Sequence, residues 1–141
     1  MNVKWNLGDW NKAVELPVEY FEKRGCFIDR RGPLSIANSS TWGFGVIVLT
    51  ESHDILSGIC GPVVPYGVKV AAEAWICSRV LLCGCSIGER AIVAAGAVVR
   101  GQDVAPGVMV AGNPARVIAR WNGAGWDYLS AAETGYSRRL E

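Results

Sequence analysis

The chain has 141 residues, 50 % of them hydrophobic, and a formal net charge of +1 at pH 7. This length allows one domain, and so small a charge gives no electrostatic reason to expect nucleic acid or an anionic membrane as a partner. No apolar run approaches the roughly 18 residues of a membrane helix, and the N-terminal segment lacks the apolar core of a signal peptide. We therefore expect a cytoplasmic protein.

The first 27 residues do not repeat, and we expect them to contain a short helix broken near Pro17. Residues 28–49 form a first repeating section, in which Ile36, Trp42 and Val48 fall six residues apart. Residues 50–66 break this period, so they are expected to leave the repeat as a loop.

The period returns over residues 67–100, with aliphatic residues at Ile87, Val93 and Val99 and small residues at Ala91 and Ala97. Residues 101–118 then close the repeat with a turn rich in glycine and proline and a last strand. The tail, residues 119–141, follows as a capping segment that could be helical from about Tyr128.

A period of six fits neither the 3.6-residue turn of a helix nor the two-residue alternation of a single strand. It predicts an all-β fold, a parallel β-helix in which each unit is one short strand and a turn, and three units make one triangular coil. We expect about four to five coils. The alternative, a helix, would have to carry Gly88, Gly96 and Gly101 in its interior.

Apolar residues also occupy outward positions of the repeat. Because neighbouring strand residues face opposite sides, the residues that precede the inward ones should point to solvent, yet they are large and apolar. These are Trp75, Leu81, Ile92 and Val98. Either they are scattered surface residues, which are common, or they are covered by self-association. We expect self-association as a homotrimer, since three-fold symmetry suits a triangular prism.

Five cysteines are present, an odd number without any Cys-x-x-Cys pair: Cys26, Cys60, Cys77, Cys83 and Cys85. This pattern argues against a secreted disulfide framework. Cys77, Cys83 and Cys85 lie inside the repeat, and we expect them to be small buried thiols in turn or core positions rather than metal ligands or redox groups.

Three motifs together resemble one known family. The segment WICSRVLLCGCSIGERAIVAAGAVV, the later DVAPGVMVAGNPARVIAR and the earlier VLTESHD are similar to the hexapeptide-repeat acyltransferases with a left-handed β-helix. Within that family the sugar O-acetyltransferases are most similar, namely the maltose, galactoside, colanic-acid and capsule-type enzymes. The resemblance covers roughly residues 28–120 and implies acetyl-CoA as co-substrate and a hydroxyl of a sugar or sugar-like acceptor.

The resemblance implies that His53, the one histidine of the chain, is the general base. A hydroxyl is a poor nucleophile until its proton is removed, and an imidazole can accept that proton near neutral pH. Asp54 follows directly, and it is expected to contact the acceptor or to order the loop, unless it is simply a solvated carboxylate. A second group should orient the imidazole, and the sequence does not identify it.

The resemblance also implies which residues contact acetyl-CoA. Trp75 would lie along the pantetheine arm, with Ser78 beside it. The main chain at Ala95 would bond to the pantetheine amides, and Arg116 would lie near the nucleotide phosphates. Arg100 stands where the family usually has threonine, and it would either reach a phosphate or remain solvated.

The chain departs from the family at LLCGCSIG, which is one residue short, so the turn between Cys83 and Cys85 must be tight. The N-terminal part is also short, so we expect the helical cap and extra coils of many family members to be reduced or missing. A γ-type carbonic anhydrase would share the fold, but it needs three histidines on zinc. One histidine per chain does not supply them, which argues against that enzyme. The alternative that stays open is a non-catalytic β-helix that acts as a binding or scaffold subunit.

Overall fold

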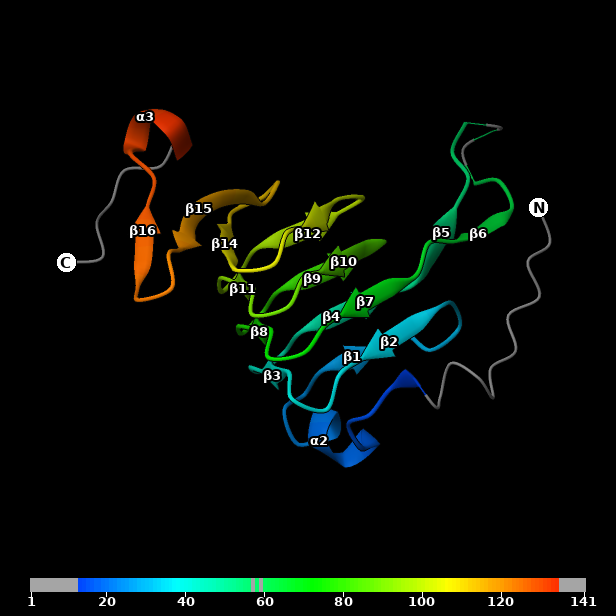
Figure 1. Ribbon diagram of the computed structural model, residues 1–141. Helices are drawn as coiled ribbons and strands as arrows, with labels where there is room; N and C mark the ends of the chain where they lie inside the picture. The colour runs from blue at the N-terminus through cyan, green and yellow to red at the C-terminus, as the bar shows by residue number, and fades with distance from the viewer. Residues whose placement is uncertain (1–12, 57, 59, 135–141) are drawn as a thin grey trace.

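Three faces, each with four parallel strands, form the sides of a prism in the computed structural model, which describes residues 13–56, 58 and 60–134 (Figure 1). Two faces are four-stranded sheets, and the third is the parallel part of a six-stranded sheet. Face A contains β2 (Leu34–Ile36), β7 (Val68–Val70), β10 (Cys85–Ile87) and β13 (Asp103–Val104). Face B contains β1 (Phe27–Ile28), β4 (Ile47–Leu49), β9 (Leu81–Cys83) and β12 (Val98–Arg100). Face C contains β3 (Thr41–Trp42), β8 (Trp75–Ile76), β11 (Ile92–Val93) and β14 (Val108–Ala111).

The chain visits faces B, A and C in turn, and each strand pairs in parallel register with the strand one coil away. This is the predicted left-handed parallel β-helix. Four strands on each face correspond to four coils, within the predicted range.

The core is the interior of the prism, and the six-residue step predicted it. The inward aliphatic side chains from successive coils stack on one another and are at most 1 % exposed. They include Ile36, Val48, Val70, Ile76, Leu82, Ile87, Val93 and Val99. Ala91 and Ala97 are buried as well. Gly88 shows how close the corners approach, because a Cβ there would lie 2.5 Å from the backbone nitrogen of Pro106.

A short helix covers the first coil. Helix α2 (Val18–Glu22) begins directly after Pro17, where a break was expected. Its buried Phe21 packs edge-to-face on Trp42, with ring centroids 5.2 Å apart, so this helix closes the lower end of the core in Figure 1. Residues 1–12 of the predicted non-repeating segment lie outside the described residues. Among the described residues, no helix is long and apolar enough to cross a membrane.

The last coil is capped by antiparallel strands. Strand β15 (Arg116–Trp121) pairs with β14, and β16 (Trp126–Tyr128) pairs with β15. Helix α3 (Ala131–Thr134) follows. The helix expected from about Tyr128 is present as α3, and the antiparallel strands before it satisfy the open edge that β14 would otherwise leave unpaired.

The loop of residues 50–66 projects from the corner between faces B and A (Figure 1). It contains an antiparallel hairpin, β5 (Glu51–His53) and β6 (Val63–Pro65). On the next coil at this corner, Gly84 alone joins β9 to β10, with φ +53°. The repeat that is one residue short is thus accommodated by a single glycine in the left-handed region.

Candidate functional site

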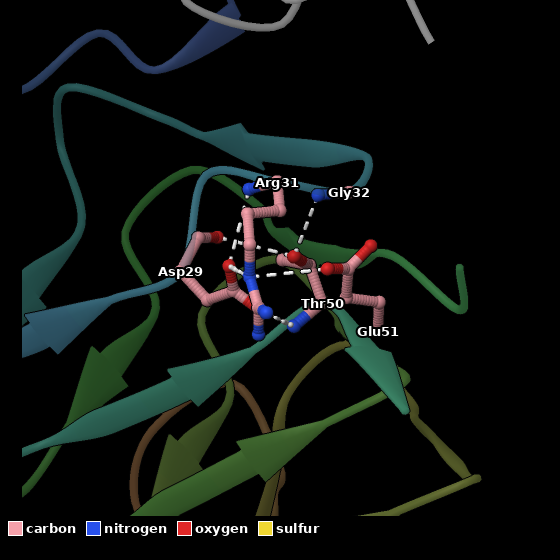
Figure 2. A network of polar contacts seen from close by, with 5 residues as sticks. All are labelled: Asp29, Arg31, Gly32, Thr50 and Glu51. Carbon is pink, nitrogen blue, oxygen red and sulfur yellow. Dashed lines mark hydrogen bonds and ion pairs between the residues drawn. The ribbon is translucent and has the colours of Figure 1, made fainter. Parts of the chain in front are cut away.

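The foot of the β5–β6 hairpin is held by a buried carboxylate (Figure 2). Asp29 is 2 % exposed, and its Oδ2 accepts a hydrogen bond of 3.1 Å from the Thr50 backbone N–H. Its Oδ1 accepts from the backbone N–H of Arg31 at 3.1 Å and from Nε of the same residue at 2.8 Å. The Thr50 hydroxyl in turn donates to the Asp29 carbonyl and accepts from the Gly32 N–H at 2.9 Å.

These contacts favour the ionised form of the carboxyl group. Burial by itself raises the pKa of Asp29, but the hydrogen bonds from the Arg31 side chain and from the Thr50 and Arg31 backbones outweigh it and lower the pKa from 3.8 to about 2. Arg31 also meets Glu51, with 3.1 Å between Nε and Oε1. The first residue of β5 is therefore tied to the same cluster.

The hairpin closes directly on this network. The backbone N–H groups of Tyr66 and Gly67 donate to the Thr50 carbonyl at 2.8 and 3.0 Å. Thr50 therefore joins the buried carboxylate to both ends of the segment that carries His53.

His53 lies exposed at the end of β5. Its Nδ1 is 2.8 Å from the Gly61 carbonyl oxygen across the hairpin. A carbonyl oxygen can only accept a hydrogen bond, so Nδ1 must carry the proton in this contact, and Nε2 is left as an acceptor. Gly61 is the orienting group that the sequence did not identify. Its backbone carbonyl selects the tautomer that a general base needs.

Asp54 turns the chain after His53. Its Oδ1 accepts a hydrogen bond of 2.8 Å from the Leu56 N–H, and its backbone bonds in both directions across the hairpin to Gly61 and Pro62. This is the short-range turn that an aspartate side chain favours. Of the roles expected from the sequence, the contacts support loop ordering, while an acceptor contact stays a prediction.

Most of the residues predicted to contact acetyl-CoA gather at the corner between faces C and B. Trp75 is 48 % exposed on β8. In the turn that follows, the Ser78 hydroxyl accepts from the Phe44 N–H at 3.0 Å, and the Ser78 carbonyl accepts from the Gly96 N–H at 3.0 Å. Ala95 lies exposed in the equivalent turn one coil above.

Arg116 lies near the same corner. It is exposed and follows Ala115, whose N–H donates to the Val98 carbonyl at 3.0 Å. Arg100 lies elsewhere, exposed at the opposite edge of face B, where it pairs in register with Cys83. Along that edge β4 ends and the hairpin begins, so Arg100 belongs with the hairpin corner.

The predicted site residues therefore form two groups on different edges of one protomer. Figure 1 shows the hairpin β5–β6 on the opposite side of the prism from β8 and β11. Among the described residues, nothing brings His53 into contact with the corner that holds Trp75, Ser78 and Ala95.

Face B, between these two edges, carries an apolar row. The outward side chains are paired in register from coil to coil: Phe27 with Ile47, Ile47 with Leu81, and Leu81 with Val98. Phe27 is 58 % exposed. The four outward residues predicted from the sequence are divided between two faces, since Trp75 and Ile92 pair on face C.

The cysteines form no disulfide among the described residues. Burial raises the pKa of the Cys85 thiol to about 12, and burial also raises that of Cys77, so neither is an activated thiolate. The part of the chain that the structure describes holds no cluster of three or more residues able to bind a metal ion.

Comparison with solved structures finds a maltose O-acetyltransferase from Clostridium difficile, 29% identical, with a TM-score of 0.58 over 67% of this chain and 52% of that one. A hexapeptide-repeat acetyltransferase from Vibrio cholerae is 26% identical, with a TM-score of 0.60 over 67% and 55%. Its complex with acetyl coenzyme A is 25% identical, with a TM-score of 0.57 over 68% and 54%.

No family model matches the chain, and a search of curated proteins finds no match. The structural neighbours nevertheless confirm the resemblance stated from the sequence, since they are hexapeptide-repeat acetyltransferases that share this β-helix. The chain spans about half the length of these neighbours.

Proposed function

We propose that the protein is an acetyl-CoA-dependent O-acetyltransferase that acts on a hydroxyl of a sugar or sugar-like acceptor. The observation that carries this proposal is the geometry of His53. On an exposed hairpin of an acetyltransferase-like β-helix, its Nδ1 is tied to the Gly61 carbonyl at 2.8 Å, which leaves Nε2 free to accept a proton.

In the proposed reaction His53 removes the proton from the acceptor hydroxyl at Nε2, and the hydroxyl oxygen becomes the nucleophile. Bound acetyl-CoA supplies the thioester: the new bond forms between this oxygen and the acetyl carbon, and the bond from that carbon to sulfur breaks. The protonated imidazole can return its proton to the departing thiolate. The Gly61 carbonyl stabilises the imidazolium that exists between the two transfers, because it accepts from Nδ1 throughout.

The corner between faces C and B fits the pantetheine arm of acetyl-CoA. The Ala95 carbonyl accepts no hydrogen bond among the described residues, so it is available to a pantetheine amide. The Ser78 hydroxyl accepts from Phe44 and retains its own proton to donate. The exposed ring of Trp75 would form an apolar wall for this arm, and the exposed Arg116 would meet a phosphate. Arg100, at the other edge, could do so only for co-substrate held by a neighbouring copy.

We propose a homotrimer because one protomer holds the two halves of the site apart. If the apolar row of face B is covered by neighbouring copies, the hairpin edge of one protomer comes to lie beside the Trp75 edge of the next. His53 would then serve co-substrate bound to its neighbour. Since acetyl-CoA is available in the cytoplasm, we place the enzyme there.

Calorimetry with acetyl-CoA tests the first requirement of this function. Binding is expected, and at 100 times its dissociation constant the ligand should stabilise the protein by about 2.7 kcal/mol, which is visible as a rise in the melting temperature. Ala95→Trp should abolish the shift by filling the corner, whereas Ala124→Trp, on the exposed β15–β16 turn, should leave it intact. No heat and no shift at millimolar acetyl-CoA would favour the scaffold alternative.

A further inference from the structure

The turn that lacks one residue creates room for an aromatic ring. Gly84 is the whole connection between β9 and β10, and a Cβ at this position would lie 2.8 Å from the Cβ of Tyr66 and 3.3 Å from its Cγ. Only glycine therefore allows Tyr66 to lie against this turn. Tyr66 remains 54 % exposed, so one side of it is covered by the turn and the rest is offered to solvent.

Beside Tyr66 a groove of about 360 Å³ runs along face A. This volume is at the small end of the range for small-molecule sites, about 300–1,000 Å³. Its floor is the outward row of the face, in which Ser35 pairs in register with Lys69, Lys69 with Ser86, and Ser86 with Asp103. All four of these residues, together with Tyr66 and Gly84, line the groove.

The polar groups of this row are only partly used. The Ser86 hydroxyl donates to Asp103 Oδ1 at 3.0 Å. Neither the Lys69 ammonium nor the Tyr66 hydroxyl has a hydrogen-bond or ion-pair partner among the described residues. The groove thus presents one unpaired cation, hydroxyls that donate and accept, and an aromatic surface. The proposed subunit interface involves the apolar row of face B. The groove lies on the polar row of face A, so it is separate from that apolar row.

The groove adjoins the hairpin that carries His53. The Tyr66 and Gly67 N–H groups close that hairpin on the Thr50 carbonyl, and β5 begins at the residue after Thr50. A molecule lying in the groove would therefore be next to the foot of the hairpin.

We propose that this groove binds a short oligosaccharide segment that carries a carboxylate, as the part of the acceptor next to the acetylated hydroxyl. The aromatic side chain of Tyr66 offers an apolar surface to the C–H face of a sugar ring, and the serine hydroxyls can exchange hydrogen bonds with sugar hydroxyls. Lys69 supplies the charge partner for one carboxylate. A polyphosphate is disfavoured because it would meet the carboxylate of Asp103 on the same row. This assignment of the acceptor class rests on the proposed function.

Calorimetry without acetyl-CoA, with neutral maltotriose and a maltotriose derivative in which one glucose is oxidised to a uronic acid as probes, tests the groove. The acidic trimer should bind about tenfold more tightly than the neutral one, as one charge-assisted hydrogen bond allows. Lys69→Gln should remove this difference, while Lys23→Gln, an exposed lysine beside α2, should not.

Two further variants test the aromatic wall. Tyr66→Ala should weaken both sugars, whereas Tyr66→Phe should retain most of the affinity. Gly84→Ala should act like Tyr66→Ala, since it displaces the ring without removing it.

Binding of neither sugar at millimolar concentration, or an acidic preference that survives Lys69→Gln, would overturn the assignment. The outcome is separable from that of the proposed function. Sugar binding without acetyl-CoA binding would support the groove and contradict the acetyltransferase. Acetyl-CoA binding without sugar binding would contradict the groove alone.

Discussion

Replacing Asp29 by asparagine tests whether a buried carboxylate holds the foot of the His53 hairpin. The substitution keeps the shape of the side chain and removes its charge. Four hydrogen bonds of 2.8–3.2 Å converge on the two carboxylate oxygens, from the Thr50 N–H and from the backbone and side chain of Arg31. An amide has only one oxygen, so its NH₂ group would face donors that can no longer be satisfied.

The size of the effect follows from the pKa of Asp29. The native contacts lower it from 3.8 to about 2, which corresponds to about 2 kcal/mol of stabilisation at 1.36 kcal/mol per pKa unit. A buried N–H left without an acceptor adds a cost of about 1 kcal/mol or more. We therefore expect Asp29→Asn to lower the free energy of unfolding by about 3 kcal/mol at pH 7.

The pH dependence has a definite sign. Because the folded-state pKa of Asp29 is lowered, its stabilisation is complete above pH 4 and is lost as the pH falls towards 2. The difference between wild type and Asp29→Asn in urea unfolding, at one protein concentration, should shrink over that window. Hydrogen exchange at the Tyr66 and Gly67 amides should accelerate in the variant, because both bond to Thr50.

Asp127→Asn is the matched control. This exposed carboxylate accepts one hydrogen bond, from Asn122 Nδ2 at 3.0 Å, so the change should cost no more than about 0.5 kcal/mol. If Asp29→Asn is as stable as this control, or if its deficit stays constant from pH 4 to pH 2, the buried carboxylate does not have the role assigned to it.

Three further changes test the core, the assembly and the site between protomers. Gly88→Ala should destabilise the fold by about 1–3 kcal/mol in urea unfolding, because its Cβ would lie 2.5 Å from a backbone nitrogen of the next coil. Gly125→Ala is the control and should be near neutral, because its Cβ would have nothing within 4 Å. Equal stabilities of the two variants would contradict this packing. Leu81→Glu should turn the proposed trimer into monomers in light scattering, since it puts a charge in the middle of the apolar row; a trimer that persists would place the interface elsewhere. Mixed trimers refolded from equal amounts of His53→Ala and Ala95→Trp should regain about a quarter of wild-type acetyl transfer. At random, about a quarter of the sites combine an intact His53 from one protomer with an intact Ala95 from its neighbour. No recovery would mean that one protomer supplies the whole site.

Much of the fold was predictable because each turn of the β-helix needs the same residue types at the same six-residue spacing. An inward position recurs every six residues, so Ile87, Val93 and Val99 had to be aliphatic and are fully buried. The missing residue before Cys85 likewise required a tight turn, which Gly84 provides. These features depend on positions close in sequence and on a period that is easy to recognise.

The support around the site was not predictable in the same way. Asp29 meets the Thr50 N–H from 21 residues away, and no local pattern distinguishes it from a solvated carboxylate. Gly61 contributes a backbone carbonyl, which any residue could supply, so its contact with His53 has no signature in the sequence. The helix expected from about Tyr128 is present as α3, but the antiparallel pairing of β16 with β15 just before it was not predicted.

The central claim is that His53 is the base of an acetyl transfer, and the most direct test is acetyl-CoA-dependent thiol release over a panel of sugars and acidic oligosaccharides. His53→Ala should lower turnover by about 10²–10⁴-fold, with acetyl-CoA affinity unchanged because the residue lies on an exposed hairpin. Equal turnover by wild type and His53→Ala would contradict the role of His53. Absence of thiol release by the wild type with every acceptor, despite acetyl-CoA binding, would contradict the acetyltransferase itself and favour a binding or scaffold subunit.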